Sequence, residues 1–97
     1  MTIQPEANVK LSGGAVSCDL TDDVMILDLS SGVYFGLEGV GSAVWRYIQE
    51  PRTVGQIIDH LLSEYDVTRE ACESQTFPFL QDLALRGLIV VEGHAGA

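Results

Sequence analysis

A chain of 97 residues is long enough for one small domain and too short for two. Its formal net charge of -9, from 14 acidic and 5 basic residues, disfavours nucleic acid and other polyanionic partners. No apolar stretch reaches the roughly 20 residues of a membrane-spanning helix, and the first residues lack a signal-peptide pattern. We therefore expect a cytoplasmic protein without membrane or nucleic-acid partners, forming a single domain over residues 1–97 with an ordered core from about 9 to 92.

Residue types that hold metals or carry out catalysis are scattered along the chain. Cys18 and Cys72 match no ligand spacing and are expected to be two reduced thiols. His60 and His94 are equally isolated, with no second ligand or base at useful spacing. Two acidic pairs are more typical of a turn and a helix end in water: Asp22 with Asp23, and Glu64 with Asp66. The sequence therefore predicts no catalytic residues, no metal site and no cofactor.

The first third of the chain predicts a meander of three antiparallel strands. Residues 1–8 are expected to be loose. Apolar and polar residues alternate from Ala15 to Leu20, which is typical of a half-buried strand. Two more strands are expected at 24–29 and 33–37, joined through Ser30-Ser31-Gly32, where glycine adopts positive φ without a Cβ penalty.

Helical patterns follow the three strands. Apolar residues at helical spacing predict a first helix from about Val40 to Ile48. Thr53 and Gln56 have the spacing of a capping box, in which the side chain of each residue accepts a hydrogen bond from the backbone N–H of the other. The apolar residues behind them predict an amphipathic second helix over residues 54–65.

A third helix is expected from about Arg69 to Arg86, but it contains a proline. Inside a helix Pro78 removes a backbone hydrogen bond and clashes with the preceding turn, at a cost of about 3 kcal/mol. We therefore expect this helix to kink near Ser74, or to restart with Thr76 as its cap, rather than to run straight. The apolar run 88–92 predicts a last strand or an extended tail, and the residues after it are expected to be disordered.

An open meander offers a free edge. If the strands pair in chain order, Val33–Leu37 is an edge strand to which another chain can add as a further strand. Tyr34 and Phe35 would supply apolar contacts, and no proline or lysine blocks pairing there. The alternative is that both aromatic residues belong to the core and that residues 88–91 cover the edge.

Five sequence blocks, read in order, cover most of the chain between Val16 and Val91. They are Ile26–Leu37, which contains Asp28-Leu29-Ser30-Ser31-Gly32-Val33-Tyr34-Phe35-Gly36-Leu37, then Val40–Trp45, Pro51–Ile58, Leu61–Val67 and Phe79–Ile89. Together they resemble the PqqD-like family, the precursor-peptide recognition elements (RiPP recognition elements) of ribosomal peptide biosynthesis. The resemblance implies an α+β, winged-helix-like fold, with a three-stranded antiparallel sheet followed by three helices.

The resemblance also implies a function. Such proteins are non-catalytic adaptors that bind the leader segment of a precursor peptide by strand addition and present it to modifying enzymes. The chain is most similar to free-standing members from lasso-peptide clusters, which implies a cysteine-type leader peptidase and an ATP-dependent cyclase as partners. The implied peptide contacts are the third strand and one face of the third helix: Val33, Tyr34, Phe35, Gly36, Glu73, Thr76, Phe77 and Leu80. Glu73 would favour Lys or Arg in the leader.

Three other functions fit parts of the sequence. One is a PqqD-type peptide chaperone for a radical-SAM enzyme, although the hairpin matches that subtype poorly. Another is a winged-helix DNA-binding regulator, which the charges oppose because the third helix carries three acids against two bases. The third is an assembly module of an enzyme complex that binds no free peptide, which the sequence does not separate from the adaptor.

Overall fold

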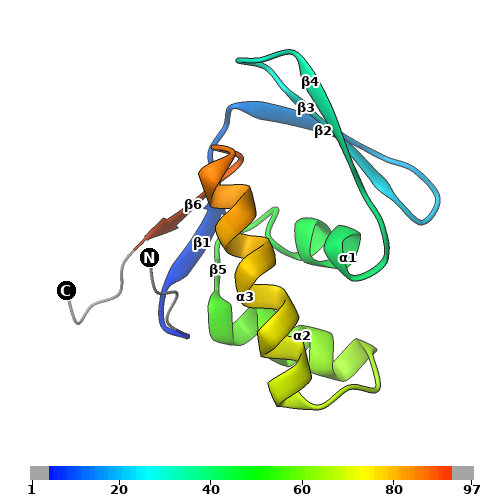
Figure 1. The fold of residues 1–97 in the computed structure, drawn as a ribbon, viewed down its shortest axis with the longest axis vertical. Helices are drawn as coiled ribbons and strands as arrows, with labels where there is room; N and C mark the ends of the chain where they lie inside the picture. The colour runs from blue at the N-terminus through cyan, green and yellow to red at the C-terminus, as the bar shows by residue number, and fades with distance from the viewer. Residues whose placement is uncertain (1–4, 93–97) are drawn as a thin grey trace.

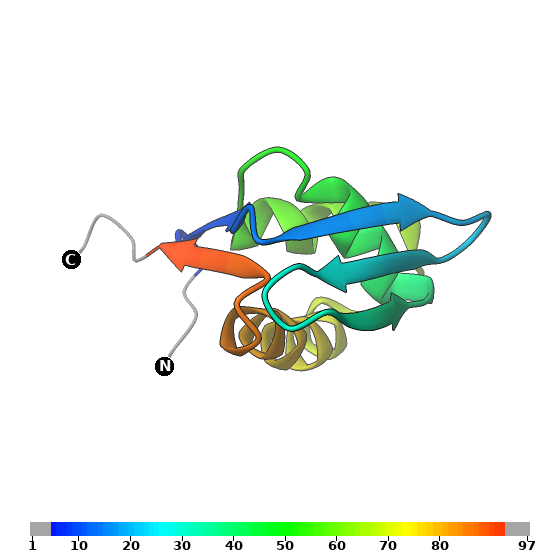
Figure 2. The ribbon, with the colours of Figure 1, turned by 90° about the horizontal axis from the view of Figure 1, so that it is seen from above.

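Six strands and three helices make up residues 5–92, the part of the chain that the computed structural model describes (Figure 1). The strands form two antiparallel sheets, and the helices pack beneath one and beside the other (Figures 1 and 2). The α+β class is as predicted, with one more sheet than expected. In chain order the elements are β1 (Asn8–Leu11), β2 (Ala15–Asp19), β3 (Val24–Asp28), β4 (Val33–Leu37), α1 (Gly39–Tyr47), β5 (Arg52–Thr53), α2 (Val54–Glu64), α3 (Arg69–Leu85) and β6 (Ile89–Glu92).

The first sheet is the predicted meander, with strand order β2-β3-β4. On its inner face, Val24 and Ile26 of the middle strand are buried in the core. The prediction that β2 is half-buried is wrong, since Val16 is 53% exposed and the inner-facing Ser17 is also exposed. The reason is that the inner face of β2 borders an open cleft of about 420 Å³ beside α1, so no helix closes over it.

The second sheet joins segments that are far apart in the sequence, in the order β5-β1-β6. Val9, in the middle strand, pairs with Arg52 on one side and Val91 on the other, and is fully buried. Within the run 88–92, residues Ile89–Glu92 therefore form a strand, as one of the two sequence interpretations predicted. It pairs with β1 and not with β4, so it does not cover the edge of the first sheet.

The N-terminal segment is held more firmly than the sequence predicted. Ala7 is buried, and its carbonyl accepts a hydrogen bond from the N–H of Val54 at 3.0 Å. The carbonyl of Pro5 accepts from the N–H of Gly55 at 2.9 Å. The expectation of loose residues is therefore wrong for 5–8, because these residues satisfy the first N–H groups of α2. The expected disorder after residue 92 lies outside the described residues.

The helices follow their predicted signals closely. At the start of α2, Gln56 N–H donates to Thr53 Oγ1 at 3.1 Å and Thr53 N–H donates to Gln56 Oε1 at 2.9 Å, which completes the capping box. At the start of α3, Ala71 N–H donates to Thr68 Oγ1 at 3.2 Å. No helix in the described part of the chain is long and apolar enough to cross a membrane.

Helix α3 runs unbroken through Pro78. The expected restart at Thr76 is therefore wrong, while a bend near Ser74 stays a prediction. Thr76 is buried in the middle of the helix, and Leu80 one turn later is fully buried. Pro78 itself is exposed, so the Ser74 carbonyl that it leaves without a helical donor is in reach of water. Burial of the opposite face of α3 outweighs the cost of the proline.

The core lies between the two sheets and the three helices. Its fully or nearly fully buried members are Val9, Val24, Ile26, Val44, Ile48, Val54, Ile57, Ile58, Leu61, Leu80, Leu83 and Leu88. Cys18 is exposed, Cys72 is buried, and both are free thiols as expected. The core therefore positions β4 and α3 next to each other, each with one side left open.

Candidate functional site

Strand β4 has a free edge. It pairs with β3 on one side, and no strand among residues 5–92 pairs with its other side. The N–H of Leu29 donates to the carbonyl of Gly14 on the β2 side of β3. Because backbone groups of successive strand residues point to alternate sides, the register turns Phe35 toward β3. The backbone N–H and C=O groups of Tyr34 and Gly36 therefore point to the free edge.

The turn before β4 is held by its own side chains. The Asp28 carboxylate accepts hydrogen bonds from the Ser30 hydroxyl (2.9 Å), the Ser31 hydroxyl (2.9 Å) and the Ser30 N–H (3.1 Å). The hydrogen bond from the Ser30 hydroxyl, followed by that from the Ser31 hydroxyl, holds the pKa of Asp28 below its usual value. Gly32 closes the turn with φ of 72°. The turn thus sets the register in which β4 begins.

A cavity of about 320 Å³ lies between β4 and the C-terminal half of α3. The guanidinium of Arg86 lies 4.8 Å from the centre of the Phe35 ring and donates to Asp82 at 3.0 Å. This end of the site therefore has an apolar floor and an ion pair at its rim. The lining residues are Tyr34, Phe35, Gly36, Leu37, Phe79, Asp82, Leu83, Arg86 and Leu88.

A second cavity, of about 160 Å³, continues from the first toward the start of α1. The two cavities share Phe79, whose ring packs on Gly41. A Cβ atom at Gly41 would lie 3.3 Å from the Phe79 ring, so glycine allows α1 to approach this closely. The lining residues are Val40, Gly41, Val44, Gln75, Thr76 and Phe79.

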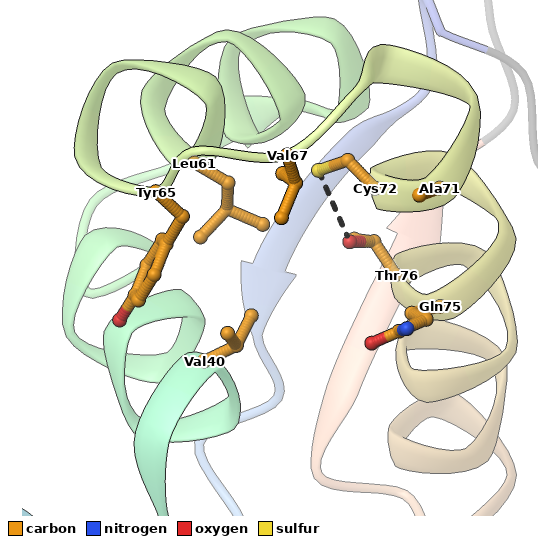
Figure 3. A pocket seen from close by; sticks show the side chains of 8 residues that line it. All are labelled: Val40, Leu61, Tyr65, Val67, Ala71, Cys72, Gln75 and Thr76. Carbon is orange, nitrogen blue, oxygen red and sulfur yellow. Dashed lines mark hydrogen bonds between the residues drawn. The ribbon is translucent and has the colours of Figure 1, made fainter.

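A third cavity, of about 80 Å³, lies where α1, α2 and α3 converge (Figure 3). It shares Val40, Gln75 and Thr76 with the second cavity. Figure 3 shows aliphatic and aromatic side chains around it, and Cys72 Sγ lies 3.8 Å from Thr76 Oγ1. Because each cavity shares lining residues with the next, the three cavities lie in a row along α3, and we call this row the α3 groove. The third cavity is lined by Val40, Leu61, Tyr65, Val67, Ala71, Cys72, Gln75 and Thr76.

The cavities lie along a different face of α3 from the one that the resemblance implied. Of its four helix residues, Thr76 lines the groove, whereas Leu80 is fully buried and Phe77 packs against the core. Glu73 accepts a hydrogen bond from Arg69 at 3.2 Å, on the side of the helix that faces Asp59 of α2. Peptide contact by Glu73, Phe77 or Leu80 stays a prediction that the groove geometry does not support.

Helical spacing accounts for the difference. Because an α-helix turns about 100° per residue, residues 75, 79, 82 and 86 share one face, and residues 73 and 77 lie on the opposite flank. The sequence interpretation missed Gln75, Phe79, Asp82 and Arg86, all of which line the groove. Their spacing of four, three and four residues was the signal that identifies this face.

Aromatic, aliphatic and polar side chains from the three helices and β4 line the groove. Among residues 5–92, no group of three or more His, Cys, Asp or Glu side chains lies close enough to hold a metal ion. His60 stacks on Tyr47 with ring centres 4.1 Å apart, away from the groove, and His94 lies outside the described residues. What the site offers is the free edge of β4 beside three cavities, of which the one next to β4 has charged residues as well as apolar ones in its lining.

Known proteins resemble this chain in sequence and in fold. A family model described as "Coenzyme PQQ synthesis protein D (PqqD)" matches residues 23–89. The solved structure "TbiB1 in Complex with the TbiA(beta) Leader Peptide" is 38% identical, with a TM-score of 0.78, and the match covers 89% of this chain and 98% of that one. "Lasso peptide synthetase B1 complexed with the leader peptide" has the same fold, with 20% identity, a TM-score of 0.74 and coverage of 84% and 96%. No curated protein sequence matches the chain.

Proposed function

Because this chain belongs to the PqqD family, we propose that it binds the leader segment of a ribosomally made precursor peptide. It acts as one domain over residues 1–97 and presents the peptide, in the cytoplasm, to a cysteine-type leader peptidase and an ATP-dependent cyclase of lasso-peptide biosynthesis. The observation that carries this proposal is the free edge of β4 lying directly beside the α3 groove. The 38% identical structure, a complex with a leader peptide, supports it.

The leader adds to β4 as a fourth strand. The outward N–H and C=O groups of Tyr34 and Gly36 align its backbone, and each such hydrogen bond contributes about 1 kcal/mol net. The neighbouring Val33 and Phe35 face β3 and hold the edge in place. Backbone pairing sets the register and direction of the leader without selecting its sequence.

Side chains of the leader fill the α3 groove and supply the selectivity. From Gln75 to Arg86 the helix rises about 17 Å, which is about five residues of an extended strand. Alternate side chains of such a strand point to one side, so three of them match the three cavities. Each apolar side chain contributes about 1.5–3 kcal/mol when fully buried. We therefore propose Gln75, Thr76, Phe79, Asp82 and Arg86 as the contacts on α3.

The proposed role is presentation without catalysis. Cys72 lines the groove, but its hydrogen-bond partner is the hydroxyl of Thr76 rather than a base that would activate the thiol. The net charge of -9 favours leaders that carry Lys or Arg beside their apolar residues.

The charge distribution opposes the DNA-binding alternative. All five basic side chains of the chain form ion pairs with acids, so none is left free for phosphate. The pairs are Lys10 with Glu92, Arg46 with Asp19, Arg52 with Glu50, Arg69 with Asp59 and Glu73, and Arg86 with Asp82.

A second candidate is a peptide chaperone for a radical-SAM enzyme, which the description of the matching family model favours. The match to the lasso-type structure covers 89% of the chain. The family model matches a smaller part, residues 23–89. A competition experiment, in which a lasso-peptide leader and a leader from a radical-SAM pathway compete for this protein, distinguishes the two functions by which peptide binds more tightly.

Calorimetric titration with the synthetic leader of the precursor encoded beside this chain tests the proposal. We expect saturable one-to-one binding with a Kd between micromolar and nanomolar, from a few backbone bonds and two or three buried side chains after ordering costs. A scrambled leader of the same composition serves as the control. Absence of binding to the leader, or equal binding of the scrambled peptide, would contradict leader recognition.

A further inference from the structure

The face of the β2-β3-β4 sheet that points away from the helices is apolar and uncovered. We call it the outer sheet face. The register places side chains of the three strands in adjacent rows on it. Val16 is 53% exposed, Leu20 48%, Met25 37% and Leu29 57%. The face consists of Val16, Cys18, Leu20, Met25, Leu27 and Leu29, and none of these side chains is charged.

The polarity of β2 is inverted relative to an ordinary sheet. In a sheet with one solvated side, apolar side chains face the core and polar side chains face water. In β2, Ser17 and Asp19 point to the helix side, where Asp19 accepts from Arg46 at 2.8 Å. Val16 and Cys18 point to the solvent side. Contiguous exposed apolar surface of this kind marks an interaction site.

The outer sheet face and the α3 groove lie on opposite sides of the same sheet. Figure 2 looks onto the outer face, with the helices behind the strands. The groove is lined by the three helices and by β4, and Tyr34 is the lining residue that lies where the groove meets the outer sheet face. A protein on the outer sheet face therefore leaves room for a peptide in the groove.

The charges around this face determine what fits it. Between Ala15 and Glu38 the sequence has five acidic residues and no Lys or Arg. Asp19 and Asp28 point to the helix side, whereas Asp22 and Asp23 in the β2-β3 turn and Glu38 after β4 border the outer sheet face at the ends of the strands. Two copies placed face to face would bring these acids together, and each copy carries a net charge of -9. The complementary surface is an apolar patch bordered by Lys and Arg on a different protein.

We propose that the outer sheet face is the docking surface for the leader peptidase, through an apolar patch on that enzyme bordered by basic residues. This rests on the proposed adaptor function, since an adaptor must hold peptide and enzyme at once. The outer sheet face is continuous with β4, where Tyr34 is 66% exposed on the same side of the sheet. An enzyme docked here lies beside the strand that holds the leader and is close to the peptide that it cuts.

Two affinities measured on the same full-length variants test the proposal. The double variant Val16→Lys, Met25→Lys places positive charge in the outer sheet face. We expect it to weaken binding of the peptidase encoded in the same gene cluster by at least about tenfold, measured by biolayer interferometry with saturating leader. Its affinity for fluorescent leader, measured by anisotropy, should stay within about twofold. Leu85→Lys is the matched control, because Leu85 is 80% exposed but lines neither the groove nor the outer sheet face.

A second, milder double variant controls for the possibility that the lysine variant fails to fold. Val16→Thr with Met25→Thr keeps good strand formers at both positions, and far-UV circular dichroism checks that both double variants fold. We expect the threonine variant to weaken peptidase binding less than the lysine variant does. Raising the salt concentration should weaken binding of the wild-type chain to the peptidase, because the acidic border is then screened.

The outcomes separate this inference from the adaptor function. If the wild-type chain does not bind leader, the adaptor function fails. If leader binds but both double variants keep wild-type affinity for the peptidase, the docking surface is refuted while the adaptor function stands. The inference also fails if sedimentation finds a wild-type dimer that the lysine variant abolishes, or if only binding of the cyclase is lost.

Discussion

Phe79 is the residue whose replacement tests the α3 groove most directly. It separates two of the cavities, and its ring is partly buried against Gly41. A bound leader would cover roughly a quarter of the 150–250 Å² that an aromatic side chain buries, or about 50 Å². At about 25 cal/mol per Å², Phe79→Ala should cost about 1.2 kcal/mol of leader binding, which raises the Kd about eightfold.

Phe77 provides a matched control for this measurement. It is the same residue type on the same helix and is also partly buried, but it lies on the flank opposite the groove. We expect Phe77→Ala to leave the leader Kd within about twofold in the same anisotropy titration, performed well below the melting temperatures of both variants. If Phe77→Ala weakens binding as much as Phe79→Ala or more, the groove face assigned here is wrong, and the face with Glu73, Phe77 and Leu80 binds the leader.

Three further results are expected. Tyr34→Pro removes an N–H that points to the free edge and should raise the leader Kd severalfold, whereas Tyr34→Ala keeps the N–H and should raise it less; equal losses would argue against strand addition. Gly41→Val forces a side chain against the Phe79 ring, 3.3 Å from the Cβ position, and should lower both the melting temperature and leader affinity; unchanged values would mean that the groove adapts. Hydrogen bonds from Ser30 and Ser31 lower the pKa of Asp28, so its stabilisation of the hairpin is complete above its usual pKa and is lost as the pH falls through the lowered value. Thermal melts of the wild type and Asp28→Asn should therefore begin to converge as the pH falls below about 4 and should coincide only below the lowered pKa, and a difference that is independent of pH would contradict this role.

The sequence alone determined the elements that depend on neighbouring residues. Thr53 and Gln56 are three residues apart, and their capping box forms as predicted. The meander β2-β3-β4 follows from apolar runs separated by short turns, with Gly32 at positive φ in one of them. In these cases the stabilising contacts join residues a few positions apart, so the local pattern contains the information.

Only the tertiary structure decided how distant segments meet. Val9 pairs with Arg52 and Val91, and a short strand with such distant partners carries no local sign of them. Two features of α3 depend on burial of Leu80 in the shared core. One is the rotation of the helix, which turns Phe79 and not Phe77 to the groove, and the other is its continuity through Pro78. Packing energy summed over the whole molecule outweighs the local preference of a single residue, and this sum sets which face of each element is left open to bind.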